Sequence, residues 1–233
     1  YCSSKIDLCY SYSNLQIEKK IQITLTRDEP GMGSVEKGET LKALVIIDMT
    51  NDFVYDTYDY EGTLYEGKLV APMGKAIVDN IAKLVIKVVK GGTVSVFRLP
   101  KDHASAFMNP ELELKIAELG INEVFITGLV EEVCIYINSM GFLERGFKTN
   151  IVKGCTAPFN KEKGREAFRE LTECGAKMVD DIPDDIKVIL LLEDEHDENS
   201  EEIKSGAWPP HNMKGTPGAL TVKTIRDALE ERI

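Results

Sequence analysis

Short apolar runs alternate with amphipathic segments from Lys42 to the end of the chain. The first run, residues 43–47, is continuously apolar and rich in β-branched residues, as in a strand buried on both faces of a parallel sheet. The same reasoning predicts further strands at residues 93–99, 123–127, 149–152, 176–179 and 188–192. Helical spacing predicts helices at residues 71–90, 111–119, 133–144, 163–173 and 221–232. We therefore expect a doubly wound α/β fold, with six mainly parallel strands and helices on both faces of the sheet.

The first forty residues do not show this pattern. Residues 15–26 could form a strand, and residues 28–38 are rich in glycine and charge, as in a turn or linker. We assign no chemistry to this part. We expect residues 1–40 to be an N-terminal extension of unknown role and residues 41–233 to be the functional domain.

Composition narrows the choice of partners. A net charge of −11 argues against a nucleic-acid partner and against an anionic membrane surface, because both need clustered Lys and Arg. No apolar run approaches the roughly 20 residues that span a bilayer, and we see no secretory signal. The five cysteines are odd in number and widely spaced, which favours reduced thiols in a cytoplasmic protein.

Three chemically useful residues follow the first three predicted strands. Asp48 follows the first strand, Lys101 the second, and Cys134 opens the helix after the third. Each alone has a plainer interpretation: a turn carboxylate, a solvated lysine and an inert core thiol. Parallel strands, however, bring their carboxyl ends to one edge, where the active sites of such sheets lie. An acid, a lysine and a cysteine together can activate a thiol, and Lys101 together with the helix start should lower the pKa of Cys134 below about 8.5.

A second group follows the last strand. Asp194 and His196 lie two residues apart, so both side chains point to one face of a strand, and His211 follows fifteen residues later. Two imidazoles and a carboxylate with open positions form a plausible catalytic zinc, iron or manganese site. Each histidine alone is more often a surface residue, and we interpret His103 in that way.

Four motifs contain the residues described above: residues 47–53 (IDMTNDF), residues 101–107 (KDHASAF), residues 128–134 (GLVEEVC) and the pair of residues 194–196 (DEH) and 208–211 (WPPH). Together they resemble the isochorismatase-like cysteine hydrolases, and the resemblance covers roughly residues 42–233. The last pair is similar to the metal motif of the nicotinamidase and pyrazinamidase branch.

The resemblance implies roles for these residues. In the family pattern Asp48, Lys101 and Cys134 form the catalytic triad, and Asp194, His196 and His211 hold one divalent ion, with zinc expected first and iron or manganese as alternatives. It also implies that Phe53 and Trp208 flank a planar substrate. A cis peptide is implied between Leu129 and Val130, with the backbone N–H groups of Val130 and Cys134 as the oxyanion hole.

The implied activity is metal-assisted hydrolysis of a small amide through a cysteine thioester, with nicotinamide as the first candidate. Another amidase of the family, acting on a carbamoyl or ureido compound, would keep the triad. A metal-free isochorismatase and a catalytically inactive binding or assembly relative remain alternatives. We expect a small-molecule substrate and a homo-oligomer.

The order of the motifs departs from the family pattern. There the metal strand precedes the lysine strand, whereas here residues 187–233 come last. Moving this block between Gly92 and Thr93 would restore the family order. Either the chain is rearranged, or the printed order is not the covalent order. We favour the second explanation because both new junctions read smoothly as family sequence, and we then expect Gly92 near Lys187 and Ile233 near Thr93.

Overall fold

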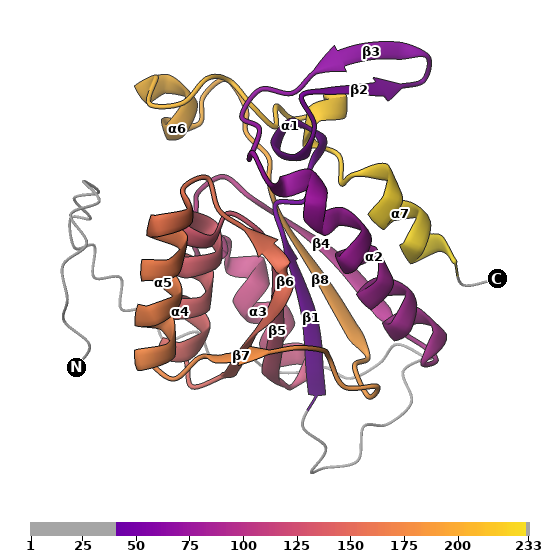
Figure 1. Ribbon diagram of the computed structural model, residues 1–233, viewed down its shortest axis with the longest axis vertical. Helices are drawn as coiled ribbons and strands as arrows, with labels where there is room; N and C mark the ends of the chain where they lie inside the picture. The colour runs from indigo at the N-terminus through magenta and orange to yellow at the C-terminus, as the bar shows by residue number, and fades with distance from the viewer. Residues whose placement is uncertain (1–40, 232–233) are drawn as a thin grey trace. The chain divides into compact units, whose positions relative to one another are not determined.

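The computed structural model describes residues 41–231, which contain a six-stranded parallel sheet in the order β4-β8-β1-β5-β6-β7 (Figure 1). The expectations for residues 1–40 lie outside the described residues. The strands of the sheet are β1 (Leu41–Ile47), β4 (Ser95–Lys101), β5 (Ile121–Leu129), β6 (Lys148–Ala157), β7 (Lys177–Val179) and β8 (Val188–Asp194). The main helices are α2 (Gly74–Lys90), α3 (Pro110–Leu119), α4 (Tyr136–Glu144), α5 (Lys161–Glu173) and α7 (Lys223–Glu230). The predicted α/β fold with six mainly parallel strands is confirmed.

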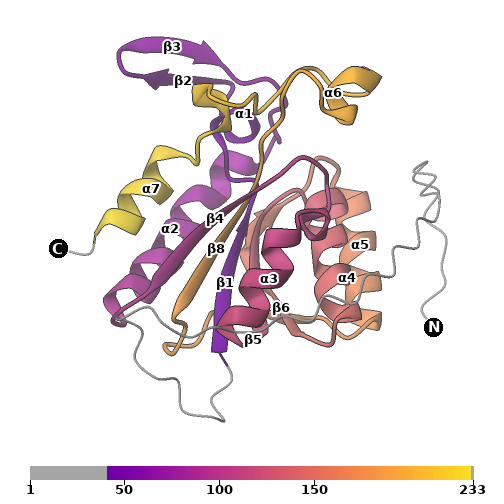
Figure 2. The same ribbon diagram turned by 180° about the vertical axis from the view of Figure 1, so that it is seen from behind.

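The side chains of β1 alternate between two apolar layers, one on each face of the sheet. Leu44 and Ile46 pack in the layer that contains residues of α2 and α7. Ala43, Val45 and Ile47 pack in the layer that contains residues of α3 and α4. Figures 1 and 2 show these helices on opposite faces of the sheet. Each fully buried large aliphatic side chain contributes about 1.5–3 kcal/mol, so the central strands are firmly fixed.

Several smaller elements were not predicted. A two-stranded antiparallel hairpin, β2 (Thr57–Tyr60) with β3 (Thr63–Glu66), follows the short helix α1 (Asn51–Val54). Another short helix, α6 (Glu201–Ser205), lies between the predicted metal residues, and 3₁₀ turns occupy Ala106–Met108 and Pro217–Ala219. The helix predicted at residues 133–144 is divided, because a π turn at Glu131–Ile135 precedes α4.

The chain passes from β7 to β8 through residues 180–187, without a helix. Ile182 is buried against the layer that contains α2, and Lys87 at the end of α2 pairs with Asp181 at 2.8 Å. Lys42 at the start of β1 pairs with Asp185 at 2.6 Å. The segment therefore runs along the amino-terminal edge of the sheet, and its packing fixes the start of β8.

The backbone follows the printed order from α2 into β4 and from residues 180–187 into β8. Lys187 also lies beside the end of α2, since its Nζ donates to the carbonyl oxygen of Gly91 at 3.1 Å. That neighbourhood is the one expected for Gly92 and Lys187, whereas Ile233 lies outside the described residues. The fold thus accommodates the printed order, and the contact between Lys187 and Gly91 also fits the family order, so the covalent order of the chain stays a prediction.

None of the helices described within residues 41–231 combines the length and apolar character that a membrane crossing requires. Two buried cysteines in this part of the chain, Cys134 and Cys155, are free thiols. Cys2 and Cys9 lie outside the described residues.

Candidate active site

Asp48 follows β1 in a left-handed backbone conformation, with φ of 53°, and is almost fully buried. Its N–H donates to the carbonyl oxygen of Leu192 at 2.9 Å, and its Oδ1 accepts from the N–H of Asp194 at 2.8 Å. These bonds tie the carboxylate to the end of the neighbouring strand β8. One oxygen is thereby engaged by the backbone, and the other faces the side chains described next.

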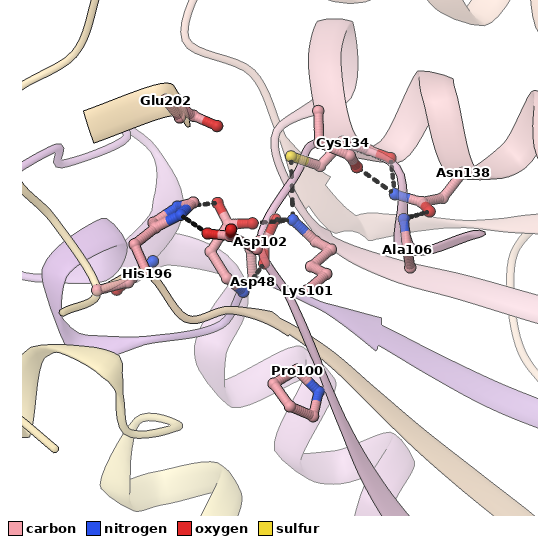
Figure 3. A network of polar contacts seen from close by, with 12 residues as sticks. Asp48, Pro100, Lys101, Asp102, Ala106, Cys134, Asn138, His196 and Glu202 are labelled. Carbon is pink, nitrogen blue, oxygen red and sulfur yellow. Dashed lines mark hydrogen bonds and ion pairs between the residues drawn. The ribbon is translucent and has the colours of Figure 1, made fainter. Parts of the chain in front are cut away.

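Lys101 ends the edge strand β4 and is 2% exposed. Its Nζ lies 2.9 Å from Oδ2 of Asp48 and 3.7 Å from Sγ of Cys134 (Figure 3). It also forms an ion pair with Asp194. The predicted triad is therefore brought together around one ammonium group. Burying a lysine in this way requires anionic partners, and Asp48 and Asp194 supply them.

Cys134 lies in the π turn that follows β5, with 7% of its surface exposed. The peptide between Leu129 and Val130 is cis, as the resemblance implies. Gly128 precedes it with φ of 112°, and a Cβ there would lie 2.0 Å from the carbonyl oxygen of Ile47. Glycine therefore allows the end of β5 to approach the end of β1, which brings the cysteine segment to the Asp48 side of the site.

The ionisation of the triad differs from the expectation for Cys134. Burial raises the pKa of the Cys134 thiol well above its usual value; the charge of Lys101 opposes this shift, and the charges of Asp48 and Asp194 add to it. The prediction of a lowered thiol pKa is wrong, because the sulfur is enclosed and faces two carboxylates.

The pKa values of the Asp48 carboxyl group and the Lys101 ammonium group are both raised, which favours the neutral form of Asp48 and the charged form of Lys101. Burial, followed by the charge of Asp194, raises the pKa of Asp48 to about 7, although Lys101 opposes this shift. Burial alone would lower the pKa of Lys101, but Asp194 and Asp48 raise it well above its usual value. The site thus holds a neutral thiol, a carboxyl group that titrates near neutrality and a permanent cation.

Asp194, His196 and His211 form a compact group of possible metal ligands. One ligand atom from each lies within 4.8 Å of the other two, and all three residues are buried. Both histidine Nε2 atoms are buried without a hydrogen-bond partner in the described structure, and Nε2 of His196 lies 3.9 Å from Oδ2 of Asp194. Two unpartnered buried nitrogens beside a carboxylate suit a divalent ion such as zinc, so the residues fit the implied metal.

The metal residues are coupled to the triad by charge. Burial raises the pKa of Asp194, but Lys101 and His196 together hold it below its usual value. Burial alone would lower the pKa of His196. The hydrogen bond and charge of Asp194, together with the hydrogen bond to Asp102, instead raise this pKa to about 9. Asp194 therefore belongs to both groups, since it contacts Lys101 on one side and faces His196 on the other.

The two predicted substrate-flanking aromatics differ in placement. Phe53 is buried in α1 with its ring centroid 5.2 Å from that of His211, so it lies beside the candidate metal residues. Trp208 is 37% exposed in the segment that leads to His211. Their contact with a substrate stays a prediction, as does the oxyanion hole at Val130 and Cys134.

Sequence reasoning missed polar residues that hold these segments in place. Asn138 is fully buried, and its side chain donates to the carbonyl oxygens of Cys134 and Ala104 and accepts from the N–H of Ala106 (Figure 3). It thereby joins the cysteine helix to the loop after Lys101. The available signal was a polar residue four positions after Cys134, on the same face of an apolar helix.

Asp52 plays a similar part on the metal side. Its carboxylate accepts from the N–H of Asn212 at 2.8 Å, which fixes the residue after His211. Gly218 packs directly against this carboxylate, where a Cβ would lie 2.3 Å from Oδ2. Asp52 belongs to the first motif, but the sequence carries no signal for its contact with the segment after His211, which depends on the fold.

Comparisons with known proteins agree with this geometry. The Isochorismatase domain family matches residues 93–182, a segment that holds Lys101 and Cys134 and begins at the junction where the motif order departs from the family pattern. An uncharacterised isochorismatase family protein, PncA of Bacillus subtilis, is 26% identical over 172 residues, which cover 66% of this chain and 87% of the relative.

Solved structures share the fold. The nicotinamidase/pyrazinamidase PncA from Bacillus subtilis superposes with a TM-score of 0.51 and 22% identity, over 60% of this chain and all of that one. The pyrazinamidase of Pyrococcus horikoshii, solved in complex with zinc, gives a TM-score of 0.50 and 18% identity, over 59% of this chain and 98% of that one. The family match over residues 93–182 and the shared fold agree with the resemblance inferred from the motifs, and the described sheet has the fold of these solved structures.

Proposed function

We propose that this protein is a metal-assisted cysteine amidohydrolase, with nicotinamide as its substrate and nicotinate and ammonia as its products. The observation that carries the proposal is the position of Lys101, whose Nζ lies 2.9 Å from Asp48 and 3.7 Å from Cys134. The adjacent group of Asp194, His196 and His211 supports the metal-assisted branch over a metal-free isochorismatase. The zinc complex of the similar pyrazinamidase supports zinc as the first ion to test.

Attack on the amide requires a proton acceptor for the buried thiol. Because the pKa of Cys134 is raised, the sulfur reacts with loss of its proton to Asp48, whose pKa of about 7 suits a general base. The sulfur then bonds to the carbonyl carbon, and Lys101 stabilises the negative charge that develops beside it. We propose that the backbone N–H groups of Val130 and Cys134 donate hydrogen bonds to the oxyanion and stabilise it.

Collapse of the tetrahedral intermediate breaks the carbon–nitrogen bond. Asp48 returns the proton to the departing nitrogen, so ammonia leaves and a thioester to Cys134 remains. Asp48, again a carboxylate, then takes a proton from the water that attacks the thioester. The carboxylic acid product leaves, and the thiol recovers its proton from Asp48, which closes the cycle.

A divalent ion held by Asp194, His196 and His211 would supply a Lewis-acidic anchor for the ring nitrogen of the substrate. The protein's own contribution on this side is orientation. The ring centroid of Phe53 lies 5.2 Å from that of His211, which supports a role for Phe53 in limiting the tilt of a flat ring. These contacts favour a planar heteroaromatic amide over a flexible aliphatic one.

Ammonia release from nicotinamide, measured on the zinc-loaded chain, tests the proposal. We expect turnover by the unaltered protein and by Cys155→Ala, and a loss of several orders of magnitude in Cys134→Ala. Cys155 is a matched control because it is also a buried free thiol. Near-normal turnover by Cys134→Ala would overturn the cysteine mechanism. Ammonia release from ureido or carbamoyl compounds but not from nicotinamide would show that the substrate is a different amide, while the cysteine mechanism would still hold.

A further inference from the structure

His196 presents only one of its ring nitrogens to the candidate metal group. Its Nδ1 lies 2.8 Å from Oδ1 of Asp102, and its Nε2 is buried among the candidate ligands without a hydrogen-bond partner in the described structure. A carboxylate at this distance accepts the Nδ1 proton, so when a metal displaces the other ring proton, the Nε2 lone pair faces the metal. The contact therefore selects the tautomer that a metal requires.

Asp102 is itself held in place. The hydroxyl of Ser200 donates to Oδ1 of Asp102, and the same hydroxyl oxygen accepts from the N–H of Asp197 at 3.0 Å. Ser200 is 4% exposed, so this hydroxyl is enclosed. Because its oxygen receives a backbone proton, its own proton is directed to the carboxylate, and Asp102 is fixed although 47% of its side chain is exposed.

The second histidine is supported differently. Nδ1 of His211 lies 2.7 Å from the carbonyl oxygen of Pro209, which is a neutral acceptor. A carboxylate is the stronger acceptor and raises the basicity of the imidazole that donates to it. The two imidazoles are therefore unequal, and His196 is the stronger donor.

We propose that Asp102 is a positioning residue of the metal centre, forming a carboxylate–histidine–metal arrangement through His196. This inference rests on the metal site of the proposed function, but it concerns a residue outside the ligand set. Asp102 directly follows Lys101, and Figure 3 shows both residues at the end of the same strand. The end of β4 therefore contributes to both groups of residues: Lys101 belongs to the catalytic triad, and Asp102 supports the candidate metal ligand His196.

Zinc affinity, measured by competition with a chromophoric chelator, tests the inference without relying on turnover. Asp102→Ala should weaken zinc binding by about 10- to 100-fold, the usual effect of removing such a partner. Asp102→Asn should recover part of the affinity, because its amide oxygen still accepts the Nδ1 proton. Asp197→Asn, which removes an exposed carboxylate next to His196 in sequence, is the matched control and should bind zinc like the unaltered protein.

Thermal unfolding of each metal-free variant establishes that it is folded. Zinc affinity in folded Asp102→Ala equal to that of the unaltered protein would overturn the role of Asp102 and leave the metal site standing. An unaltered protein that binds neither zinc, manganese(II) nor iron(II) would overturn the metal site and this inference together. Zinc binding that depends on Asp102, in a protein that does not hydrolyse nicotinamide, would support the inference and would contradict only the proposed substrate.

Discussion

At the residue scale, the site combines groups whose chemistry depends on their neighbours. The positions of Asp48, Lys101 and Cys134 could be predicted because parallel strands deliver their ends to one edge of the sheet. The pKa of Cys134 could not, because it depends on how many atoms enclose the sulfur and on the charges facing it. A helix start provides only a weak partial charge, whereas burial and two carboxylates act through a low-dielectric interior.

The role of Asp48 as the proton carrier leads to a specific expectation. Asp48→Asn keeps the oxygen that accepts the N–H of Asp194 but cannot take the thiol proton. We expect kcat for nicotinamide to fall by about 10²- to 10⁴-fold, the range for a lost general base. Asp184→Asn, which changes a 90% exposed carboxylate in the segment between β7 and β8, serves as the comparison and should keep the kcat of the unaltered protein. A kcat for Asp48→Asn within a few-fold of the unaltered protein would assign the base elsewhere.

At the scale of elements, apolar periodicity located every strand of the main sheet but not the β2–β3 hairpin. The hairpin strands are largely polar and exposed, so they lack the continuous apolar signal of β1. Their two-residue turn places Glu61 and Gly62 at φ of 51° and 79°, a conformation for which Asn-Gly is the usual sequence. Residues 180–187 were equally hard to predict, because a crossover between parallel strands usually contains a helix.

That crossover should owe its stability to one apolar contact more than to its ion pairs. Ile182 is 3% exposed within the layer that contains α2, so Ile182→Ala should lower the free energy of unfolding by about 2–4 kcal/mol. Asp184 pairs with Lys87 at 3.3 Å but has a 90% exposed side chain, so Asp184→Ala should cost less than about 1 kcal/mol. Urea unfolding of both variants makes the comparison. Equal losses would mean that Ile182 does not anchor the segment.

At the scale of the whole molecule, the site does not depend on the order in which the chain visits the strands. Asp48, Lys101, Cys134 and the metal residues converge because β4, β8, β1 and β5 are neighbours in the sheet. The sequence predicted this convergence through the carboxyl-end rule, although the metal strand β8 comes last. The path of the chain could not be predicted in the same way, because the motif residues report which strands meet and not how they are joined.

The order of the chain can be read directly from tryptic peptides. In the printed order, cleavage after Lys90 and Arg98 gives residues 91–98, GGTVSVFR, and cleavage after Lys177 and Lys187 gives residues 178–187, MVDDIPDDIK. In the family order, residue 233 would join residue 93 and give ITVSVFR, and the first peptide would be replaced by GGK. Because both new junctions read smoothly as family sequence and Lys187 lies beside Gly91, we expect mass spectrometry to find ITVSVFR in place of GGTVSVFR. Detection of GGTVSVFR and MVDDIPDDIK would instead establish the printed order, with the same strands and the same site.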